Sequence, residues 1–534
     1  MNRFPRFLGL AVFTSGMAAL GIEMAASRLL GNVFGTSNLV WANIIGLILV
    51  YLSAGYFLGG RWADRHPEPA IFYRILAWAA LTTGMVPAIS RPVLLAAASA
   101  VENIDAAVAL GSFAAVLVLF LVPITLMGCA SPFAIRLAIQ EVRAAGDMAG
   151  KLYAVSTLGS IVGTFLPVLW LIPAIGTIRT FFVFAGLLLL VALIGLFRAN
   201  RRLGWLHLWM PPALVLLYLL ATRGPIKETP GQILERESAY NYIQVVEMSG
   251  VRIPCLDNTV VENVRLLRLN EGEGVHSMYS PAQLLTCGTW DYFLAAPFFN
   301  AAPHDPAQVQ SLAIVGLAAG TAARQFTSVY GPIPIEGYEI DPAIIEIGRA
   351  YFGMTEPNLD ALAVDGRWGL EHSRQRFSVI AVDAYRPPYI PPHLTTQEFF
   401  TIVRDRLAPD GVLTINVARL PDDRRLIEGL AATLQTVFPS IFVVDVPQSM
   451  NSILYATMQP ATFENLAANR ERLARGGEAD PALLTVLGWV LDNRQTTPAG
   501  GPVFTDDKAP IEQITNAMVI QFILSGRLDL IAPQ

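Results

Sequence analysis

Two kinds of residue in this chain are suited to chemistry: acids that follow short apolar runs, and a turn of small residues that lies among them. The run Leu312–Leu317 has the length and β-branched content of a buried strand. It leads into a small-residue turn, Gly316–Thr321, and then into a helix-compatible run, Ala322–Val329. A second short strand, Ile333–Glu339, ends in an acid 19 residues after the last glycine of the turn.

This order of strand, turn, helix and acid predicts a nucleotide-type site. Gly316, Ala318 and Gly320 would let the backbone approach a ligand closely, and the start of the helix would offer unpaired N–H groups. Glu339 would then reach ribose hydroxyls. The alternative is an ordinary α/β turn that binds nothing.

Two more acids occupy comparable places. Asp365 and Gly366 follow a short apolar stretch, and a carboxylate there could accept a hydrogen bond from an adenine amino group. Asp383 ends the strand-like run that begins at Ser378, and Tyr385 follows two residues later. A carboxylate at a strand tip opens into the ligand crevice and suits a base that removes a proton from an amine. For each Asp the alternative is a helix cap or a loop-ordering role.

The elements that position these residues alternate between strand and helix patterns from Ser311 onward. We therefore predict a doubly wound parallel sheet with its ligand at the carboxyl ends of the strands. The expected strands are 312–317, 333–339, 378–382 and 411–417, with a late pair near 440–445 and 452–458. Before them, 242–246 and 264–269 alternate as hairpin strands do.

Composition divides the chain into unlike parts. The chain has 534 residues, of which 53% are hydrophobic and 15% charged, and roughly the first 220 are membrane-like. The net charge of −5 argues against a nucleic-acid partner. The three cysteines, Cys129, Cys255 and Cys287, show no metal-ligand spacing, so we predict no metal site. A disulfide between Cys255 and Cys287 is one alternative, but we expect unpaired buried thiols.

Seven apolar runs are candidates for crossing a bilayer, which makes the protein a multi-pass membrane protein. They fall near 7–30, 38–59, 71–89, 106–127, 152–173, 178–197 and 204–222. The first is read as a retained anchor, since it lacks the character of a cleavable signal. The apolar segment from Pro92 to Val101 is too short to cross and is expected to be re-entrant or interfacial.

Arginine and lysine cluster in alternate loops and give the orientation. The rich side holds Arg3, Arg6, Arg61, Arg65, Arg74, Arg136, Arg143, Lys151, Arg198, Arg201 and Arg202, and the poor side little more than Arg28, Arg91 and Arg179. We therefore place the N-terminus in the cytoplasm and the protein in the cell (inner) membrane. Seven true spans would put the following domain outside, where adenosyl cofactors are not normally supplied. We therefore expect the 204–222 segment not to cross fully.

Two features of the apolar part go beyond hydropathy. Glu23 lies in the middle of the first apolar run. Its carboxyl is either a substrate or proton site, or a hydrogen-bonded structural group. The loop Gly59–Arg65 resembles the loop between the second and third helices of major facilitator transporters, and 127–197 resembles helices four to six of such a half. That resemblance implies a second half from another copy, hence a homo-oligomer.

Residues 236–460 carry motifs, in order, that resemble the spermidine synthase (polyamine aminopropyltransferase) family. They are Glu237–Ile243, the glycine-rich turn, Tyr338–Pro342, Val364–Arg367, Asp383 and Leu394–Phe400. With the apolar helices ahead of it, the chain resembles the membrane-fused branch of the family. The resemblance implies a small N-terminal β domain, a methyltransferase-like Rossmann sheet, and decarboxylated S-adenosylmethionine or S-adenosylmethionine as co-substrate. Glu339 would hold the ribose, Asp365 the adenine, and Asp383 would be the base.

The chain departs from the family on the side of the amine. An Asp of the family's glycine-rich turn is absent from Ala319-Gly320-Thr321, and a second Asp, three residues after the catalytic one, is Arg386 here. The family's Tyr-Gln pair appears as Tyr240-Asn241, and a Gln is replaced by His276. We assign these last three residues and Tyr385 to substrate binding. The adenosyl side of the site looks kept and the amine side rebuilt.

The predicted architecture is thus a helical bundle (1–222), a linker (223–235), a small β domain (236–300) and a Rossmann-like domain (301–534). The leading function is transfer of an aminopropyl or related group from an adenosyl sulfonium to a small amine. One alternative is an S-adenosylmethionine-dependent methyltransferase. The other is a transport or sensor protein whose domain binds a ligand without chemistry.

Overall fold

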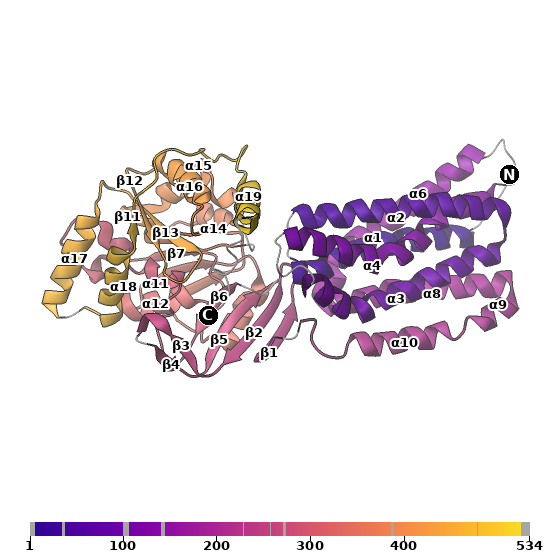
Figure 1. Cartoon of the computed structure of the whole chain (residues 1–534), viewed down its shortest axis with the longest axis horizontal. Helices are drawn as coiled ribbons and strands as arrows, with labels where there is room; N and C mark the ends of the chain where they lie inside the picture. The colour runs from indigo at the N-terminus through magenta and orange to yellow at the C-terminus, as the bar shows by residue number, and fades with distance from the viewer. Residues whose placement is uncertain are drawn as a thin grey trace. The chain divides into compact units, whose positions relative to one another are not determined.

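The computed structural model describes residues 6–34, 38–99, 106–139, 145–227, 229–256, 258–270, 274–385, 389–477 and 479–524. They fall into two compact units, Met1–Thr229 with Arg236–Tyr242, and Pro230–Glu235 with Ile243–Gln534 (Figure 1). The first unit is helical and the second is α/β.

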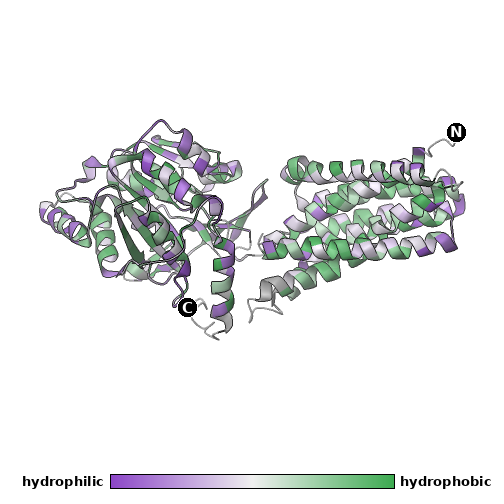
Figure 2. Ribbon diagram, turned by 90° about the horizontal axis from the view of Figure 1, so that it is seen from above, coloured by the Kyte–Doolittle hydropathy of each residue, from purple (hydrophilic) through white to green (hydrophobic). Residues whose placement is uncertain are grey.

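The first unit is a bundle of apolar helices. Its helices are α1 (Arg6–Phe34), α2 (Asn38–Arg65), α3 (Pro69–Ser99), α4 (Ala106–Gly128), α5 (Ala130–Ala138), α6 (Ala145–Leu166), α7 (Ile172–Ile175), α8 (Thr177–Ala199), α9 (Arg201–Leu206) and α10 (Met210–Ala221). A π-helical turn, Pro167–Leu171, joins α6 to α7. Within the described residues, seven helical stretches are long and apolar enough to cross a membrane, and hydrophobic residues run along them (Figure 2).

Small residues let two of these helices approach closely. A Cβ at Gly159 would lie 2.1 Å from the Phe13 carbonyl oxygen, and one at Gly163 would lie 2.1 Å from that of Met17. The two glycines are four residues apart on α6, so one face of this helix packs directly on the backbone of α1.

The segment after Pro92 is not a separate re-entrant piece, which corrects the expectation from sequence. Helix α3 continues through Pro87 and Pro92 to Ser99, and Val101 lies outside the described residues. The Ser90 hydroxyl donates to the Pro87 carbonyl at 2.9 Å. A serine hydroxyl of this kind helps a proline-containing helix to continue in an apolar setting.

The second unit begins with strands that form small antiparallel sheets. The strands are β1 (Gln232–Glu237), β2 (Tyr242–Met248), β3 (Val251–Ile253), β4 (Thr259–Val261), β5 (Val264–Leu269) and β6 (Val275–Tyr279). One sheet has the order β1-β2-β5-β6, and β3 pairs with β4. The two hairpin strands expected from alternation, β2 and β5, are confirmed and pair with each other.

The main sheet has eight strands in the order β14-β12-β13-β11-β10-β7-β8-β9. They are β7 (Leu312–Val315), β8 (Ile335–Tyr338), β9 (Leu359–Leu362), β10 (Phe377–Val382), β11 (Leu407–Ala418), β12 (Ser440–Asp445), β13 (Asn451–Thr457) and β14 (Arg494–Gln495). Strands β9, β8, β7, β10 and β11 are parallel, as predicted for β7, β8, β10 and β11, while β9 was not among the predicted strands. The prediction of a wholly parallel sheet was wrong, because β13 runs antiparallel to both β11 and β12.

Helices cover both faces of this sheet because its strands are buried on both sides. Leu312 and Ile314 of β7 pack with α11 (Thr289–Phe293), α12 (Thr321–Tyr330), α17 (Phe463–Gly476) and α18 (Pro481–Asp492). Ala313 and Val315 pack on the other face with α14 (Gly366–His372), α15 (Gln397–Arg406), α16 (Arg425–Gln435) and α19 (Ile511–Leu524). Helix α13 (Pro342–Tyr351) follows β8. The arrangement is a Rossmann-like sheet of the methyltransferase type.

Candidate functional site

Strand register brings three of the predicted site residues to one edge of the sheet. Val315 at the end of β7 pairs with Tyr338 of β8 and with Val382 of β10. The next residue on each strand is therefore Gly316, Glu339 or Asp383. Strand order changes direction between β7 and β10, and ligands of open α/β sheets bind outside the strand ends at such a point.

The turn after β7 needs glycine at two positions. Gly316 has φ +90°, and a Cβ on it would lie 2.6 Å from the Asp383 carbonyl oxygen. Gly320, at the start of α12, has φ +88°, and its Cβ would meet Met354 at 2.6 Å. Both positions exclude a side chain by backbone conformation and by space. Ala318, between them, also has positive φ, at 47°.

Glu339 is bonded to this turn. Its Oε2 accepts the Ala318 N–H at 3.0 Å, and its Oε1 accepts the Asp341 N–H at 3.0 Å. Burial raises the pKa of Glu339 to about 7, and these backbone bonds lower the pKa in part. Glu339 therefore joins the tip of β8 to the turn after β7. Its contact with a ribose stays a prediction.

Asp365 caps helix α14, which is the alternative role that its sequence left open. Its Oδ1 accepts the N–H groups of Arg367 and Trp368, each at 3.0 Å, and its Oδ2 lies 2.9 Å from Nε2 of His393. The His393 hydrogen bond is the largest cause of its lowered pKa. A Cβ on the next residue, Gly366, would lie 2.5 Å from Val315 Cγ1. Cap and adenine contact are compatible, and the second stays a prediction.

Two neighbouring side chains hydrogen-bond the Asp383 carboxyl and affect its pKa. Asn416 on β11 donates from Nδ2 to its Oδ1 at 2.8 Å, and the Trp290 side chain hydrogen-bonds it as well. Asn451 donates from Nδ2 to the Asn416 Oδ1 at 2.7 Å, which fixes the orientation of the Asn416 amide. Burial raises the pKa of Asp383 to about 7, against the two hydrogen bonds, which lower it. Such a carboxyl exchanges a proton near neutral pH.

Tyr385 is bonded to the same strand, β11, that holds Asp383 through Asn416. Its hydroxyl donates to the Asn416 carbonyl at 3.1 Å, and burial raises its pKa well above the ordinary value. The phenol is therefore neutral and already bonded to the backbone. A role in binding substrate stays a prediction for this residue. Arg386 lies outside the described residues.

The other substrate-binding candidates precede the main sheet in the chain, and one of them, His276, is on strand β6. Ser277 accepts the Ala319 N–H at 2.9 Å, so β6 lies against the glycine-rich turn, and His276 is the preceding residue. The Nε2 of His276 is buried and has no hydrogen-bond partner among the described residues. Burial lowers the pKa of His276 to about 4, so the ring is neutral. Tyr240 and Asn241 belong to the first compact unit, and their assignment stays a prediction.

A small pocket opens beside the same turn. Its lining residues come from β6, the turn, α12 and the residue after α13: Met278, Tyr279, Leu284, Ala319, Gly320, Thr321, Arg324, Gln325 and Phe352. The Arg324 guanidinium lies 4.8 Å above the Tyr279 ring. The pocket therefore offers one cation next to Thr321.

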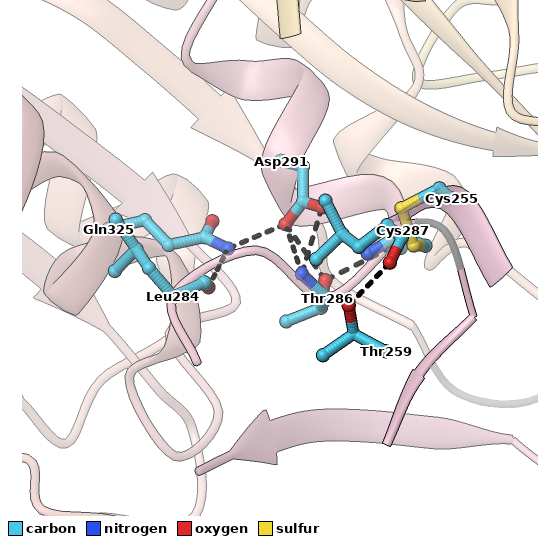
Figure 3. The surroundings of a disulfide bond; sticks show 9 residues. Cys255, Thr259, Leu284, Thr286, Cys287, Asp291 and Gln325 are labelled. Carbon is cyan, nitrogen blue, oxygen red and sulfur yellow. Dashed lines mark hydrogen bonds between the residues drawn. A yellow bond between two sulfur atoms is a disulfide. The ribbon is translucent and has the colours of Figure 1, made fainter. Parts of the chain in front are cut away.

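The expectation of unpaired thiols was wrong for two of the three cysteines. Cys255 and Cys287 form a disulfide with a Cα–Cα distance of 5.9 Å, and Cys129 is a buried thiol (Figure 3). The pair is 32 residues apart in sequence, with Cys255 between β3 and β4 and Cys287 between β6 and α11. Spacing alone does not reveal such a contact.

The disulfide holds a loop that contains a buried acid. The N–H groups of Thr286 and Cys287 donate to the Asp291 carboxylate at 2.7–3.0 Å, and Gln325 of α12 donates to it at 2.6 Å (Figure 3). Burial raises the pKa of Asp291 to about 6, and these bonds lower it in part. The next residue back is Trp290, the neighbour of Asp383.

Sequence reasoning missed four side chains: Trp290, His393, Asn416 and Asn451. Asn416 had a usable signal, because it is a polar residue near the end of an apolar strand next to the strand of Asp383. Trp290 and His393 come from segments with no such pattern.

Comparisons with known proteins agree with this geometry. Residues 307–466 match the Spermine/spermidine synthase domain family. A probable polyamine aminopropyl transferase of Bifidobacterium longum is 32% identical over 310 residues, which cover 54% of this chain and 63% of that protein. A polyamine aminopropyltransferase of Vibrio vulnificus is 25% identical over 287 residues, which cover 52% of this chain and 89% of that protein.

A crystal structure of a probable spermidine synthase from Corynebacterium glutamicum is also similar. It is 19% identical, with a TM-score of 0.38, and the match covers 52% of this chain and 98% of that one. The matched family lies on the strands and the turn that carry Gly316, Glu339, Asp365 and Asp383. Residues 307–466 of this chain thus resemble a spermine/spermidine synthase domain.

Proposed function

We propose that the protein is a membrane-anchored aminopropyltransferase-like enzyme that moves an aminopropyl or related group from an adenosyl sulfonium to a small amine. One observation carries the proposal: Asp383 and Gly316 lie side by side at the ends of two paired strands. Each directly follows a member of the Val382–Val315 pair of β10 and β7. The base and the adenosyl-binding features thus share one edge of the sheet.

The chemistry follows from this placement. The neutral amine nitrogen attacks the carbon next to the sulfonium, so a C–N bond forms while the C–S bond breaks. The thioether leaves with the electron pair and needs no acid. Asp383, with its pKa near 7, takes the proton that the ammonium must lose before attack. Decarboxylated S-adenosylmethionine is the donor that the family suggests.

On the donor side, Glu339 and the turn would bind the ribose, and Asp365 with Gly366 the adenine. The N–H groups at the start of α12 would lie near the donor. On the acceptor side, His276 offers an unpaired, neutral ring nitrogen, which suits a hydrogen bond better than an ion pair. Tyr385 is a further candidate on the amine side, and the assignment of Tyr240 and Asn241 rests on the sequence alone.

The bundle would hold the enzyme in the cell membrane with the N-terminus in the cytoplasm. Seven helical stretches of sufficient length and hydropathy support the anchoring. Arginines at the ends of α2 and α8 and at the start of α9 support the orientation.

One observation favours a second candidate, a methyltransferase that uses intact S-adenosylmethionine. Arg324 lines the pocket beside Thr321, and a cation there can meet the carboxylate that the intact donor keeps. Removing Arg324 would weaken binding of the intact donor alone if this candidate is right.

The test uses the full-length protein in detergent, with each of the two sulfonium donors and a panel of diamines and monoamines. Mass spectrometry then identifies the product as the aminopropylated or the methylated amine. Thioether production that depends on the decarboxylated donor supports the proposal. Methylated product supports the second candidate. Binding of either donor without any product overturns both and leaves a ligand-binding protein.

A further inference from the structure

We infer that the C-terminal domain lies on the outer, oxidising side of the membrane, opposite the N-terminus, and that its disulfide forms there. This reverses the expectation that the 204–222 segment stops short of crossing. Two independent observations carry the inference: the path of the seventh apolar segment through the bundle, and the disulfide itself.

The seventh segment is long enough to span. Its two helices, α9 and α10, and the turn between them cover Arg201–Ala221, which is 21 residues. At 1.5 Å per residue this is about 30 Å, the thickness of a hydrocarbon core. The two prolines, Pro211 and Pro212, fall in the first turn of α10, where a proline removes no helix hydrogen bond.

Aromatic contacts show that this segment runs the whole length of α8. Trp205 packs on Phe197, near the end of α8, with ring centroids 5.7 Å apart. Tyr218 packs on Phe182, near the start of α8, at 5.3 Å. The stretch from Trp205 to Tyr218 thus follows α8 from Phe197 to Phe182, which is most of its length.

The chain after α10 leaves the bundle at the end with few basic residues. Arg91 of α3 donates to the Arg223 carbonyl at 3.3 Å and also to that of Pro225. Thr177, the first residue of α8, donates its N–H to the Glu237 carboxylate at 2.6 Å.

The opposite end carries the cationic cluster of the bundle. Its described members are Arg6, Arg61, Arg65, Arg74, Arg136, Lys151, Arg198, Arg201 and Arg202. Such clusters stay in the cytoplasm, so the end where the linker emerges faces outward.

The disulfide in the second compact unit also indicates that the C-terminal domain lies on the outer side. Disulfides persist in oxidising compartments and are rare in the reducing cytosol. The bonded loop is also part of the folded domain, because its N–H groups hold the buried Asp291. A cytoplasmic location would leave both thiols reduced.

One consequence rests on the proposed function. Donor and amine must both be present on the outer side. Because an adenosyl sulfonium is a cation and crosses a bilayer poorly, a transport step for such a cation must precede the transfer.

The experiment labels single added cysteines in the full-length protein in intact cells with a membrane-impermeant maleimide. Ala468 is exposed on α17 of the C-terminal domain, and Glu68 is exposed between α2 and α3 at the cationic end. We expect Ala468→Cys to react in intact cells and Glu68→Cys only after permeabilisation. The wild-type protein gives the background, since Cys129 is buried and the other two cysteines are paired.

A second readout counts reactive thiols after acid quenching and denaturation, by the mass added by a polyethylene-glycol maleimide. We expect one thiol before reduction and three after it. Protection of Ala468→Cys in intact cells, or three reactive thiols before reduction, overturns the inference. Neither readout depends on enzyme activity, so this result is separable from a failure of the proposed function.

Discussion

The two sides of the site are built in different ways. On the adenosyl side, the acids are bonded to the backbone: Glu339 holds Ala318 N–H, and Asp365 caps α14. On the proposed amine side, two further acids of the resembled family are absent at Thr321 and Arg386, and Asp383 is held by neutral donors, Asn416 and Trp290. Under the proposed function, backbone geometry would fix the donor-binding residues, while the transfer would depend on one carboxyl whose pKa is near 7.

The largest expected effect comes from removing that carboxylate. Asp383→Asn keeps the shape of the side chain and one acceptor oxygen for Asn416, but loses its charge and basicity. Loss of a general base typically costs about 10²–10⁴-fold in rate. We expect such a fall in the transfer rate, measured by thioether release, with donor binding nearly unchanged.

The matched control is Asp360→Asn, an exposed carboxyl on β9. It should leave the rate unaltered. If Asp383→Asn instead lowers the thermal midpoint while the surviving protein turns over normally, Asp383 is a loop-ordering residue and the comparison between the two sides fails.

The next effect concerns the disulfide-bonded loop before α11. Helix α11 supplies Trp290 to Asp383, and its Asp291 accepts a hydrogen bond from Gln325 of α12 and from N–H groups of the loop. Replacing Cys255 and Cys287 by serine removes a cross-link between residues 32 apart. Disulfides typically contribute about 2–4 kcal/mol, so we expect the free energy of unfolding to fall by that order. Denaturant titration measures it, and Cys129→Ser is the thiol control.

An unchanged denaturation midpoint in the double variant would show that the loop holds its place without the cross-link. Activity and donor binding, measured on the same sample, then tell which side of the site depends on the loop.

Glu339→Ala is expected to act on the donor side alone. A hydrogen bond to a charged group contributes about 1.5–3 kcal/mol, and calorimetry with an adenosyl thioether should show a loss of that size. Because Glu339 also holds the turn, Glu339→Gln serves as a second variant that keeps an acceptor. Equal binding by wild type and both variants would remove the ribose assignment.

How far the sequence predicts this site depends on how local each contact is. Glu339 and Asp383 follow apolar strands of parallel type, so their arrival at one sheet edge follows from register. His393 is 28 residues from Asp365, and Asn451 is 35 from Asn416, so tertiary packing alone sets these contacts. Likewise, an apolar run such as β13 reads the same in either direction, which is why its antiparallel course was missed.

The topology conflict has a similar cause. Hydropathy marks the 204–222 segment as apolar but does not say whether it packs through the bundle. The contact of Tyr218 with Phe182 carries that information. The Cys255–Cys287 pair, equally nonlocal, bears on the same question.

The smallest expected effect tests whether a neutral donor tunes the base. Trp290→Phe keeps an aromatic ring but removes the indole N–H that bonds Asp383. This bond stabilises the carboxylate and lowers its pKa, so its loss raises the pKa above the wild-type value of about 7. Asp383 accepts a proton only when deprotonated, so the rate rises with pH through its pKa. We therefore expect the acid limb of the pH–rate profile to move to higher pH by on the order of one unit, since one unit is about 1.4 kcal/mol.

The rate plateau at high pH separates this role from packing. Above the raised pKa, the carboxylate is ionised with or without the indole, so the plateau should match that of the wild type. A uniform fall at every pH, with the acid limb in place, would mean that Trp290 only fills space. In that case Asn416 would be the remaining described side chain that donates to Asp383, and the amine side would depend on a single positioned amide.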